Sequence, residues 1–296
     1  MRLSAAIPIC AAGLWLIAAA PPPTPEQAWK AGILDENRDY AQVPHAMLKI
    51  QSSAYLHEGD TAVLVGEKGN PGSYRWAKSA GAQGVLVVAL KGGKITATKD
   101  GAAVGLDEIT KSIPIDKDVD VAGQPTQVDA GVDGWRIFVY NQQNPAAKTF
   151  KGVSYFPYDP AFRVIAEFAP DPKRPARVFR TSRGTDKQFY HVGDARFSLK
   201  GAKIVLPLYA GSNDPRKIDD VSAFFTDDMT GKGAYGAGRY VDVDDFGKFP
   251  PSTITIDFNN AYNPNCARSA HFTCPIAVDD IPVAVTAGER DPHMAH

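Results

Sequence analysis

The feature that most constrains the fold of this chain is a succession of short β-like segments separated by turn residues. Segments rich in Val, Ile, Thr, Tyr and Phe recur about every 8 to 12 residues, which is typical of β-sandwiches and barrels. They span residues 61–65, 84–90, 94–98, 135–140, 162–168, 176–180, 188–192, 195–199, 203–209, 223–226, 235–243, 253–258 and 283–287. A parallel α/β sheet would need helices between these segments. We therefore predict a mostly β fold, an antiparallel sandwich or barrel-like assembly with one N-terminal helix.

The helix is predicted at the start of the mature chain. Thr24-Pro25-Glu26 supplies an N-cap, a proline at the first helical position and an acidic first turn. Trp29, Ile33 and Leu34 then fall on one face, and the pattern continues to about Tyr40.

Residues 1–20 have the pattern of a secretory signal. Arg2 precedes an apolar run, and Ala18-Ala19-Ala20 offers a small-residue cleavage site. An uncleaved membrane anchor is the alternative, although the run barely reaches the length of a span and contains Pro8. The favoured interpretation is a periplasmic or secreted protein, with no transmembrane segment after cleavage.

Composition shifts suggest how the mature chain is divided. The polar stretch 111–134 has few aromatic residues and reads as a linker or edge loops, or alternatively as a meander within one domain. We predict an N-terminal helix with a small β subdomain over 21–130, a main β domain over 131–290 and a disordered tail at 291–296.

Charge and motifs exclude several function classes. The formal net charge of −1 offers no basic excess for nucleic acid. No G-x-S-x-G, H-E-x-x-H or P-loop motif occurs. The G-x-G-x-x-G letters at 231–236 precede a strand-like run instead of a helix, so they do not indicate a dinucleotide site. We predict no cofactor, while the oligomeric state stays open.

Asp257 and Asn259 form the first candidate site. Side chains alternate along a strand, so these two share one face. A carboxylate and an amide in this arrangement could bind a polar ligand group or position a water molecule. The alternative is structural: Asp257 pairs with a buried arginine, and Asn259 caps the following turn.

Arg239 is the second candidate. It lies on a strand-like run with apolar Val241 and Val243 at alternating positions, so its guanidinium needs a carboxylate or a ligand. Candidate partners are Asp227, Asp257 and Glu289, and both a structural ion pair and a ligand site fit the pattern.

Cys266 and Cys274 are the only cysteines outside the leader and enclose a loop with His271. An oxidising compartment favours a disulfide between them. Reduced structural thiols and a metal or redox site are the alternatives. The spacing matches no zinc pattern and supplies only three ligands, so we predict no metal.

Several motifs together resemble a known family. They are 152–164, 235–240, 257–264, Cys266, Cys274-Pro275 and 287–289. This set resembles the bacterial and archaeal family called domain of unknown function 1684, well over 150–290 and loosely over 25–150. The resemblance places Arg239, Asp257, Asn259, Asn263 and Glu289 at recurrent polar positions, but it implies no activity.

The chain departs from the family pattern at three places. Met229 replaces a threonine, Ala234 replaces another, and 277–280 lacks the family's proline-rich, Asn-containing segment. If those hydroxyl and amide groups act in a site, this member has altered it.

Two hypotheses follow from these candidates. The first is an exported module that binds a small polar or anionic ligand, or an envelope partner. Its binding residues would be Tyr235, Arg239, Asp257, Asn259, Asn263 and Glu289. The alternative is a hydrolase with Asp257 or Glu289 as general base and Arg239 holding an anion or oxyanion.

Overall fold

The computed structural model describes residues 22–77, 84–105, 110–244 and 246–293, and it confirms the mostly β fold class. The predicted signal at 1–20 and the last three residues of the predicted tail lie outside this part of the chain. Within the described residues, no helix combines the length and the apolar character needed to cross a bilayer.

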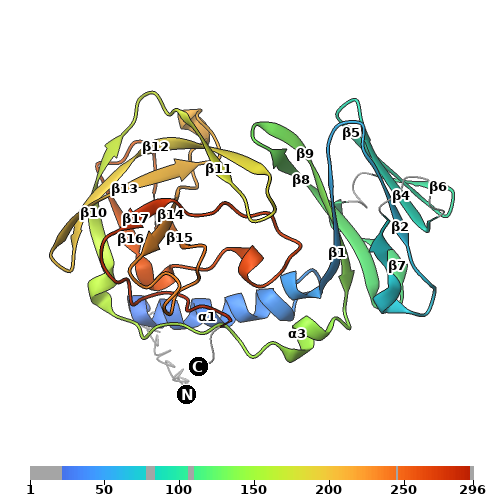
Figure 1. Cartoon of the computed structure of the whole chain (residues 1–296), viewed down its shortest axis with the longest axis horizontal. Helices are drawn as coiled ribbons and strands as arrows, with labels where there is room; N and C mark the ends of the chain where they lie inside the picture. The colour runs from blue at the N-terminus through green and yellow to red at the C-terminus, as the bar shows by residue number, and fades with distance from the viewer. Residues whose placement is uncertain (1–21, 78–83, 106–109, 245, 294–296) are drawn as a thin grey trace, which may run out of the picture.

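The C-terminal half is a closed barrel of antiparallel strands (Figure 1). Strand β10 pairs with β16 on one side and with β12 on the other, which closes the sheet. Around the barrel the order is β10 (Arg163–Pro170), β16 (Thr253–Asp257), β15 (Arg239–Asp244), β14 (Ser222–Asp227), β13 (Ala202–Ala210) and β12 (Asp186–Leu199). Two further strands attach to it, β11 (Ala176–Arg180) on β12 and the parallel β17 (Asp279–Ile281) on β14.

The barrel interior is the main hydrophobic core. Along β13, Ile204, Leu206 and Leu208 are buried, whereas the intervening Val205 is exposed. This period of two is the alternation on which the sequence prediction depended.

Two smaller sheets make up the N-terminal half. One has the order β1 (Ile50–Leu56), β9 (Val132–Asn141), β8 (Val119–Asp129) and β7 (Ile113–Asp116). The other has the order β3 (Arg75–Trp76), β2 (Thr61–Val65), β4 (Leu86–Lys91), β5 (Lys94–Lys99) and β6 (Ala102–Val104). Buried side chains of both sheets, such as Leu64 and Val139, form one shared core.

The prediction of a linker or edge loops at 111–134 is wrong. Most of this stretch forms β7, β8 and the start of β9, and β9 pairs with both β8 and β1. The predicted domain limit at residue 130 therefore falls inside the β8–β9 hairpin. The change from one sheet system to the other comes after β9 instead.

Helix α1 (Pro25–Ala41) confirms the predicted N-terminal helix. Thr24 and Gln27 form a reciprocal capping box, and Pro25 begins the helix. None of its residues is fully buried. It lies along the barrel and reaches towards the N-terminal sheets, as Figure 1 shows, with short helix α3 (Pro145–Thr149) beyond its end.

Several strand predictions need correction. The segments predicted at 188–192 and 195–199 belong to the single long β12, and β15 begins only at Arg239. Residues 283–287 are not a strand. The strands that the sequence did not indicate are β1, β3, β6, β7, β8 and β17.

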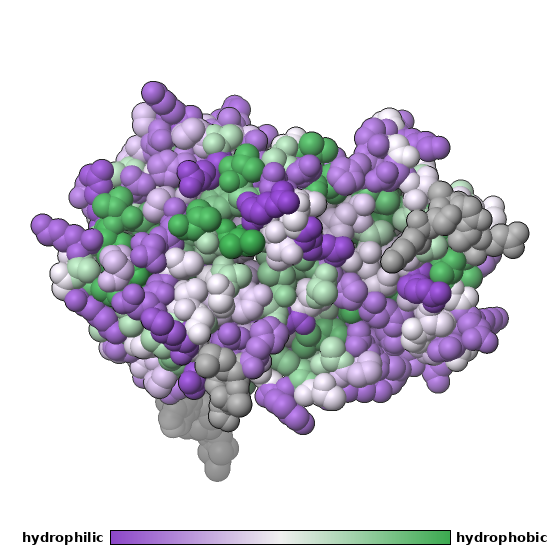
Figure 2. Space-filling model, viewed as in Figure 1, coloured by the Kyte–Doolittle hydropathy of each residue, from purple (hydrophilic) through white to green (hydrophobic). Residues whose placement is uncertain are grey.

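Figure 2 shows one face of the molecule, on which hydrophobic residues lie in small separate groups among hydrophilic ones. Isolated apolar side chains of this kind are normal on a protein surface. The cavities therefore carry more information about binding than this face does.

Candidate functional site

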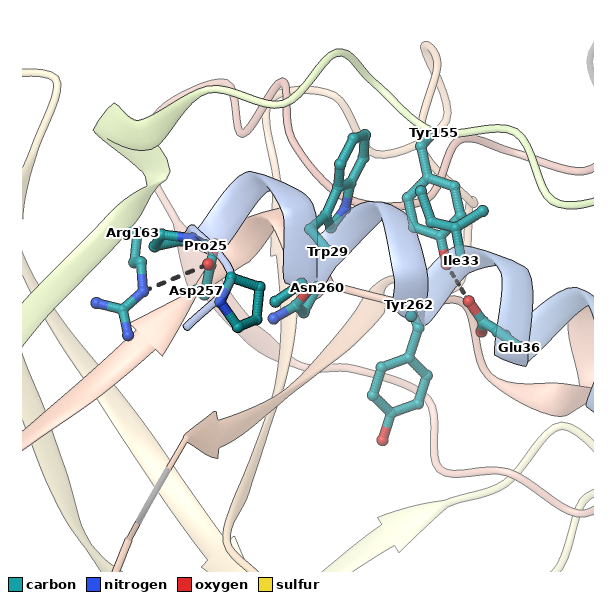
Figure 3. Close-up of a pocket in the computed structure, with 12 residues that line it drawn as sticks. Pro25, Trp29, Ile33, Glu36, Tyr155, Arg163, Asp257, Asn260 and Tyr262 are labelled. Atoms are coloured by element: carbon teal, nitrogen blue, oxygen red, sulfur yellow. Dashed lines mark hydrogen bonds and ion pairs between the residues drawn. The ribbon is translucent and has the colours of Figure 1, made fainter. Parts of the chain in front are cut away.

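A cavity of about 510 Å³ lies between α1 and the barrel, and we call it the α1 cavity. One wall is a single face of the helix, from Pro25 through Trp29, Gly32 and Ile33 to Glu36, spaced by three or four residues as a helical face requires. The opposite wall comes from the barrel and its loops: Tyr155, Arg163, Asp257, Asn260 and Tyr262. Figure 3 shows Asp257 and Arg163 near the start of the helix and Glu36 with Tyr155 towards its other end.

Asp257 lines the α1 cavity, but its carboxylate is already engaged. One oxygen accepts hydrogen bonds from the backbone N–H (3.0 Å) and the side-chain amide (2.8 Å) of Asn259. The other lies 3.6 Å from Nε of Arg163, whose side chain is partly exposed. Asp257 therefore has the structural role of the second alternative, but in different detail: its arginine partner is partly exposed, and Asp257 itself, not Asn259, caps the short 3₁₀ helix Phe258–Asn260.

Asn259 is completely buried and joins three segments. Its amide group exchanges two hydrogen bonds of 2.9 Å with the backbone of Asp159. Its carbonyl accepts from the indole Nε1 of Trp29 at 2.8 Å, which ties α1 to the barrel. This residue positions the walls of the cavity and does not itself line it.

Arg239 is buried and forms an internal ion pair. Its Nη2 donates to Oδ2 of Asp227 at 2.6 Å and to the carbonyl of Val285 at 2.8 Å. Its Nη1 donates to the carbonyls of Ala287 and Glu289. Both terminal nitrogens thus have acceptors, and 1% of the residue is exposed. We assign Arg239 a structural role, because an external anion cannot reach it.

Glu289 is fully buried beside the C-terminal end of α1. Its Oε2 accepts the backbone N–H of Asn263 at 2.9 Å and lies 3.1 Å from Nη2 of Arg268. Asn263 also donates its side-chain amide to the carbonyl of Arg290 at 2.8 Å. Burial raises the pKa of Glu289 to about 8; Arg268 opposes the rise and nearby Glu36 adds to it.

Glu36 and Tyr155 are site residues that the sequence analysis did not single out. Tyr155 pairs through its backbone with Glu289, and its hydroxyl donates to the Glu36 carboxylate. Burial, together with Glu289 and Glu36, raises the pKa of Tyr155 far above its usual range, so the phenol stays protonated. The sequence does not indicate that Glu36 belongs to a site, because a glutamate on a helix with mostly polar residues is usually a solvent-exposed surface residue.

Tyr235 and the cysteines lie in a different place. Tyr235 is half-buried, does not line the α1 cavity and has its ring 6.1 Å from that of His293. Cys266 and Cys274 are free thiols, so the predicted disulfide is not found. The Cys266 backbone N–H lies 3.3 Å from Sγ of Cys274. The hydrogen bond from Cys274 lowers the pKa of Cys266 to about 6.

The sequence-predicted residues therefore do not form one open site. Arg239, Asn263 and Glu289 belong to one buried network, and Asp257 and Asn259 belong to a second at the other end of α1. Of the six predicted binding residues, Asp257 is the one that lines the cavity. Among the described residues, no group of three or more His, Cys, Asp or Glu side chains is arranged to hold a metal ion.

Comparisons with known proteins place the chain in a family. A search of curated proteins found no match. A solution NMR structure of an uncharacterized protein from Haloarcula marismortui is 31% identical, with a TM-score of 0.41, over 50% of this chain and 80% of that one. The family described as "Protein of unknown function (DUF1684)" matches residues 148–290, which include all the predicted site residues. Through these residues the chain belongs to the DUF1684 family, as its motifs indicated.

Proposed function

We propose that this chain is an exported binding module whose small polar ligand occupies the α1 cavity. The observation that carries the proposal is the lining of that cavity. Its volume of about 510 Å³ combines the carboxylates of Glu36 and Asp257 with the aromatic rings of Trp29, Tyr155 and Tyr262. Small-molecule sites typically have a few polar groups set among apolar and aromatic walls, in volumes of roughly 300 to 1,000 Å³.

The way α1 is held supports this role. The helix forms one wall of the cavity, yet it contributes no fully buried residue to a core. Its contacts to the barrel side are few and specific, among them the Trp29 indole to Asn259 and the Asn37 carboxamide to the backbone of Val153 at 2.7 Å. A wall of this kind can shift to admit a ligand without disturbing the barrel core.

The hydrolase alternative loses its anion-holding group, because Arg239 is buried and its terminal nitrogens are engaged. The proposal therefore stays with binding. Asp257 remains a ligand contact in it through the edge of its carboxylate that faces the cavity.

Filling the cavity tests the proposal. Gly32 lines it, and a Cβ atom built there meets nothing within 4 Å, so a larger side chain enters open space. We expect Gly32→Phe to abolish binding of small polar compounds identified by NMR titration of the wild-type protein. Gly32→Ala is the matched control: it leaves most of the space free and stabilises the helix by roughly 1 kcal/mol. A ligand that binds Gly32→Phe as well as Gly32→Ala would lie elsewhere and refute the proposal.

Export is the part of the proposal that depends on the leader pattern of residues 1–20. We expect protein recovered from the periplasm or the medium to begin close to Pro21, as measured by N-terminal sequencing. Recovery from the cytoplasm with Met1 retained would contradict export and leave the cavity proposal unaffected.

A further inference from the structure

A second cavity, of about 520 Å³, lies where the two halves of the chain meet, and we call it the junction cavity. One wall is a face of β9 that carries Arg136 and Phe138. The opposite face of that strand carries Ile137 and Val139, which are buried in the N-terminal core. The end of α1 and Phe272 of the C-terminal half complete the walls. Among the described residues that line this cavity, Glu36 alone also lines the α1 cavity.

The guanidinium of Arg136 is held in place on this wall. Gln124 of β8 lies opposite Arg136 in the sheet. In the amide orientation that satisfies both side chains, the Gln124 oxygen accepts from Nε of Arg136 at 2.9 Å and also from Nη2. The guanidinium carbon lies 5.4 Å from the ring centre of Phe138 and 5.8 Å from that of Phe272. The bonds to Gln124 use Nε and Nη2, so Nη1 is left for a ligand.

Arg136 is positioned in this way but lacks a counter-ion. It is half-buried, yet no carboxylate in the described part of the chain lies within 4.0 Å of its guanidinium. The buried guanidinium groups of Arg239 and Arg268 differ, because each has a carboxylate partner. A charge that is partly removed from water needs an opposite charge, so the junction cavity has one position that suits an anion.

The acidic residues of the junction cavity do not fill this position. Asp39 pairs with Arg38. Glu36 accepts the hydroxyl of Tyr155, and its carboxylate lies more than 4.0 Å from the Arg136 guanidinium. These two carboxylates repel a second negative charge, which disfavours phosphates and other polyanions. The anion that fits is therefore one with a single charge, such as a carboxylate.

A second cation without a carboxylate partner lies near Arg136. Lys187 of β12 is half-buried, and among the described residues no carboxylate lies within 4.0 Å of its ammonium group. Burial lowers the pKa of Lys187, and Arg136 lowers it further, while Cys274 opposes the change. Lys187 does not line the cavity, so it adds to the attraction for an anion without contacting it.

The rest of the wall is aromatic. The rings of Phe138 and Phe272 lie 5.3 Å apart, and the ring of His45 is stacked on that of Tyr140 at 4.5 Å. His45 is already paired with Asp120, so it does not compete with Arg136 for the anion. Flat aromatic surfaces beside one placed charge are typical of sites for small organic acids with an apolar body.

We infer that the junction cavity is a second ligand site, which binds a small monocarboxylate with an aromatic or other apolar body. Its carboxylate accepts hydrogen bonds from Nη1 of Arg136 and from the second hydrogen of Nη2, and its body packs on Phe138 and Phe272. Guanidinium and carboxylate groups are both planar and match in this way. No covalent bond changes. The site is separate from the α1 cavity, so the inference does not depend on the proposed function.

The experiment is isothermal titration calorimetry of the full chain at neutral pH with 3-phenylpropionate as the probe. The neutral isostere 3-phenylpropanamide and the cation 3-phenylpropylamine are the controls, because the three compounds share one apolar body. We expect the carboxylate to bind at least about tenfold more tightly than either control, since a charge-assisted hydrogen bond is stronger than a neutral one. Equal binding of the carboxylate and the amide, or no binding of the carboxylate, would overturn the inference.

Two variants assign the preference to one side chain. Arg136→Gln removes the charge, so we expect the ratio of carboxylate to amide affinity to fall at least about tenfold. Arg183→Gln is the matched control, because Arg183 also lies over an aromatic ring, that of Tyr55 at 5.4 Å, and does not line the junction cavity. It should leave the ratio unchanged. A preference that survives in Arg136→Gln would overturn the inference.

Nuclear Overhauser effects in the wild-type protein locate the ligand even if Arg136→Gln does not fold. We expect effects between the ring protons of 3-phenylpropionate and those of Phe138 and Phe272. Effects that involve neither ring would place the ligand elsewhere and overturn the inference.

Gly32→Phe separates this site from the α1 cavity. Gly32 does not line the junction cavity, so we expect the variant to bind 3-phenylpropionate as the wild type does. Loss of carboxylate binding in Gly32→Phe together with its retention in Arg136→Gln would place the carboxylate in the α1 cavity, which overturns the inference and supports the proposed function. Carboxylate binding that depends on Arg136 would stand even if no ligand were found for the α1 cavity.

Discussion

At the residue scale, a buried charged side chain supplies the hydrogen bonds that a neighbouring strand would otherwise make to the C-terminal segment. Residues 283–287 have the alternation of a strand, yet their carbonyls at Val285 and Ala287 accept hydrogen bonds from the Arg239 guanidinium. A planar group with five donors can satisfy several carbonyls at once. The alternation of residues 283–287 therefore indicates their burial correctly. Their carbonyls, however, are hydrogen-bonded to the Arg239 side chain instead of to another strand.

Part of this network could be predicted from the sequence. A guanidinium on an apolar strand face had to find acids, and Asp227 was among the three named for Arg239. That Glu289 pairs with Arg268 and approaches Glu36 could not be predicted, because it depends on how α1 lies against the barrel. Nothing in the spacing of residues 36 and 289 indicates that Glu36 comes near enough to raise the pKa of Glu289.

Glu289 should make stability fall as pH rises. Its pKa is about 8 when folded against an ordinary value of 4.5, so between these values the folded state binds more protons than the unfolded state. The free energy of unfolding therefore decreases with rising pH across that window. We expect urea titrations to show a shallower decrease for Glu289→Gln than for wild type between about pH 5 and pH 8. Equal slopes would mean that the group titrates normally.

At the scale of elements, the strands that the sequence located best are short runs that contain β-branched or aromatic residues. Strands β2 and β11 match their predicted bounds, 61–65 and 176–180. Strand β8 was missed because Gly123, Pro125 and Asp129 disfavour β-structure by composition. It forms because β7 and β9 pair with both of its edges. Pairing context of this kind is absent from a single segment.

Helix α1 should be the least stable element that packs against the barrel, because none of its residues is fully buried. We expect Trp29→Ala to raise amide hydrogen exchange throughout α1 while leaving exchange in the barrel strands unchanged. The variant loses the indole hydrogen bond, worth about 1 kcal/mol, and the ring contacts to Tyr155 and Tyr158. Leu34→Ala is the control, since Leu34 lies on the same helix but is largely exposed. Equal exchange in both variants would show that Trp29 does not anchor the helix.

At the scale of the whole molecule, a small cluster joins the two sheet systems. Phe138 and Tyr140 of β9 pack with Phe272 and Cys274 from the C-terminal half, and Tyr40 at the end of α1 borders them. The rings of Phe138 and Phe272 lie 5.3 Å apart. This cluster packs between the two larger cores, whose sheets also meet through hydrogen bonds between Gln127 of β8 and Gln188 of β12.

Removing the Phe272 ring should uncouple these cores. We expect Phe272→Ala to cost about 3 to 5 kcal/mol at the junction and to split one calorimetric unfolding transition into two. Ile165→Ala on the exposed side of the barrel provides the comparison and should retain a single transition. A single transition in both variants would show that the halves are coupled by other contacts.

Strand β12 serves two neighbours along one edge: residues 186–190 pair with β11 and residues 193–196 with β10. The changeover is at Gly193, where a Cβ atom would come within 2.5 Å of the carbonyl oxygen of Ala169. Because Gly193 has no Cβ atom, this edge of β12 can change its partner there from β11 to β10. The pairing with β10 closes the barrel, and the pairing with β11 covers the aromatic residues outside it. Any substitution at Gly193 must therefore disrupt one of these two pairings.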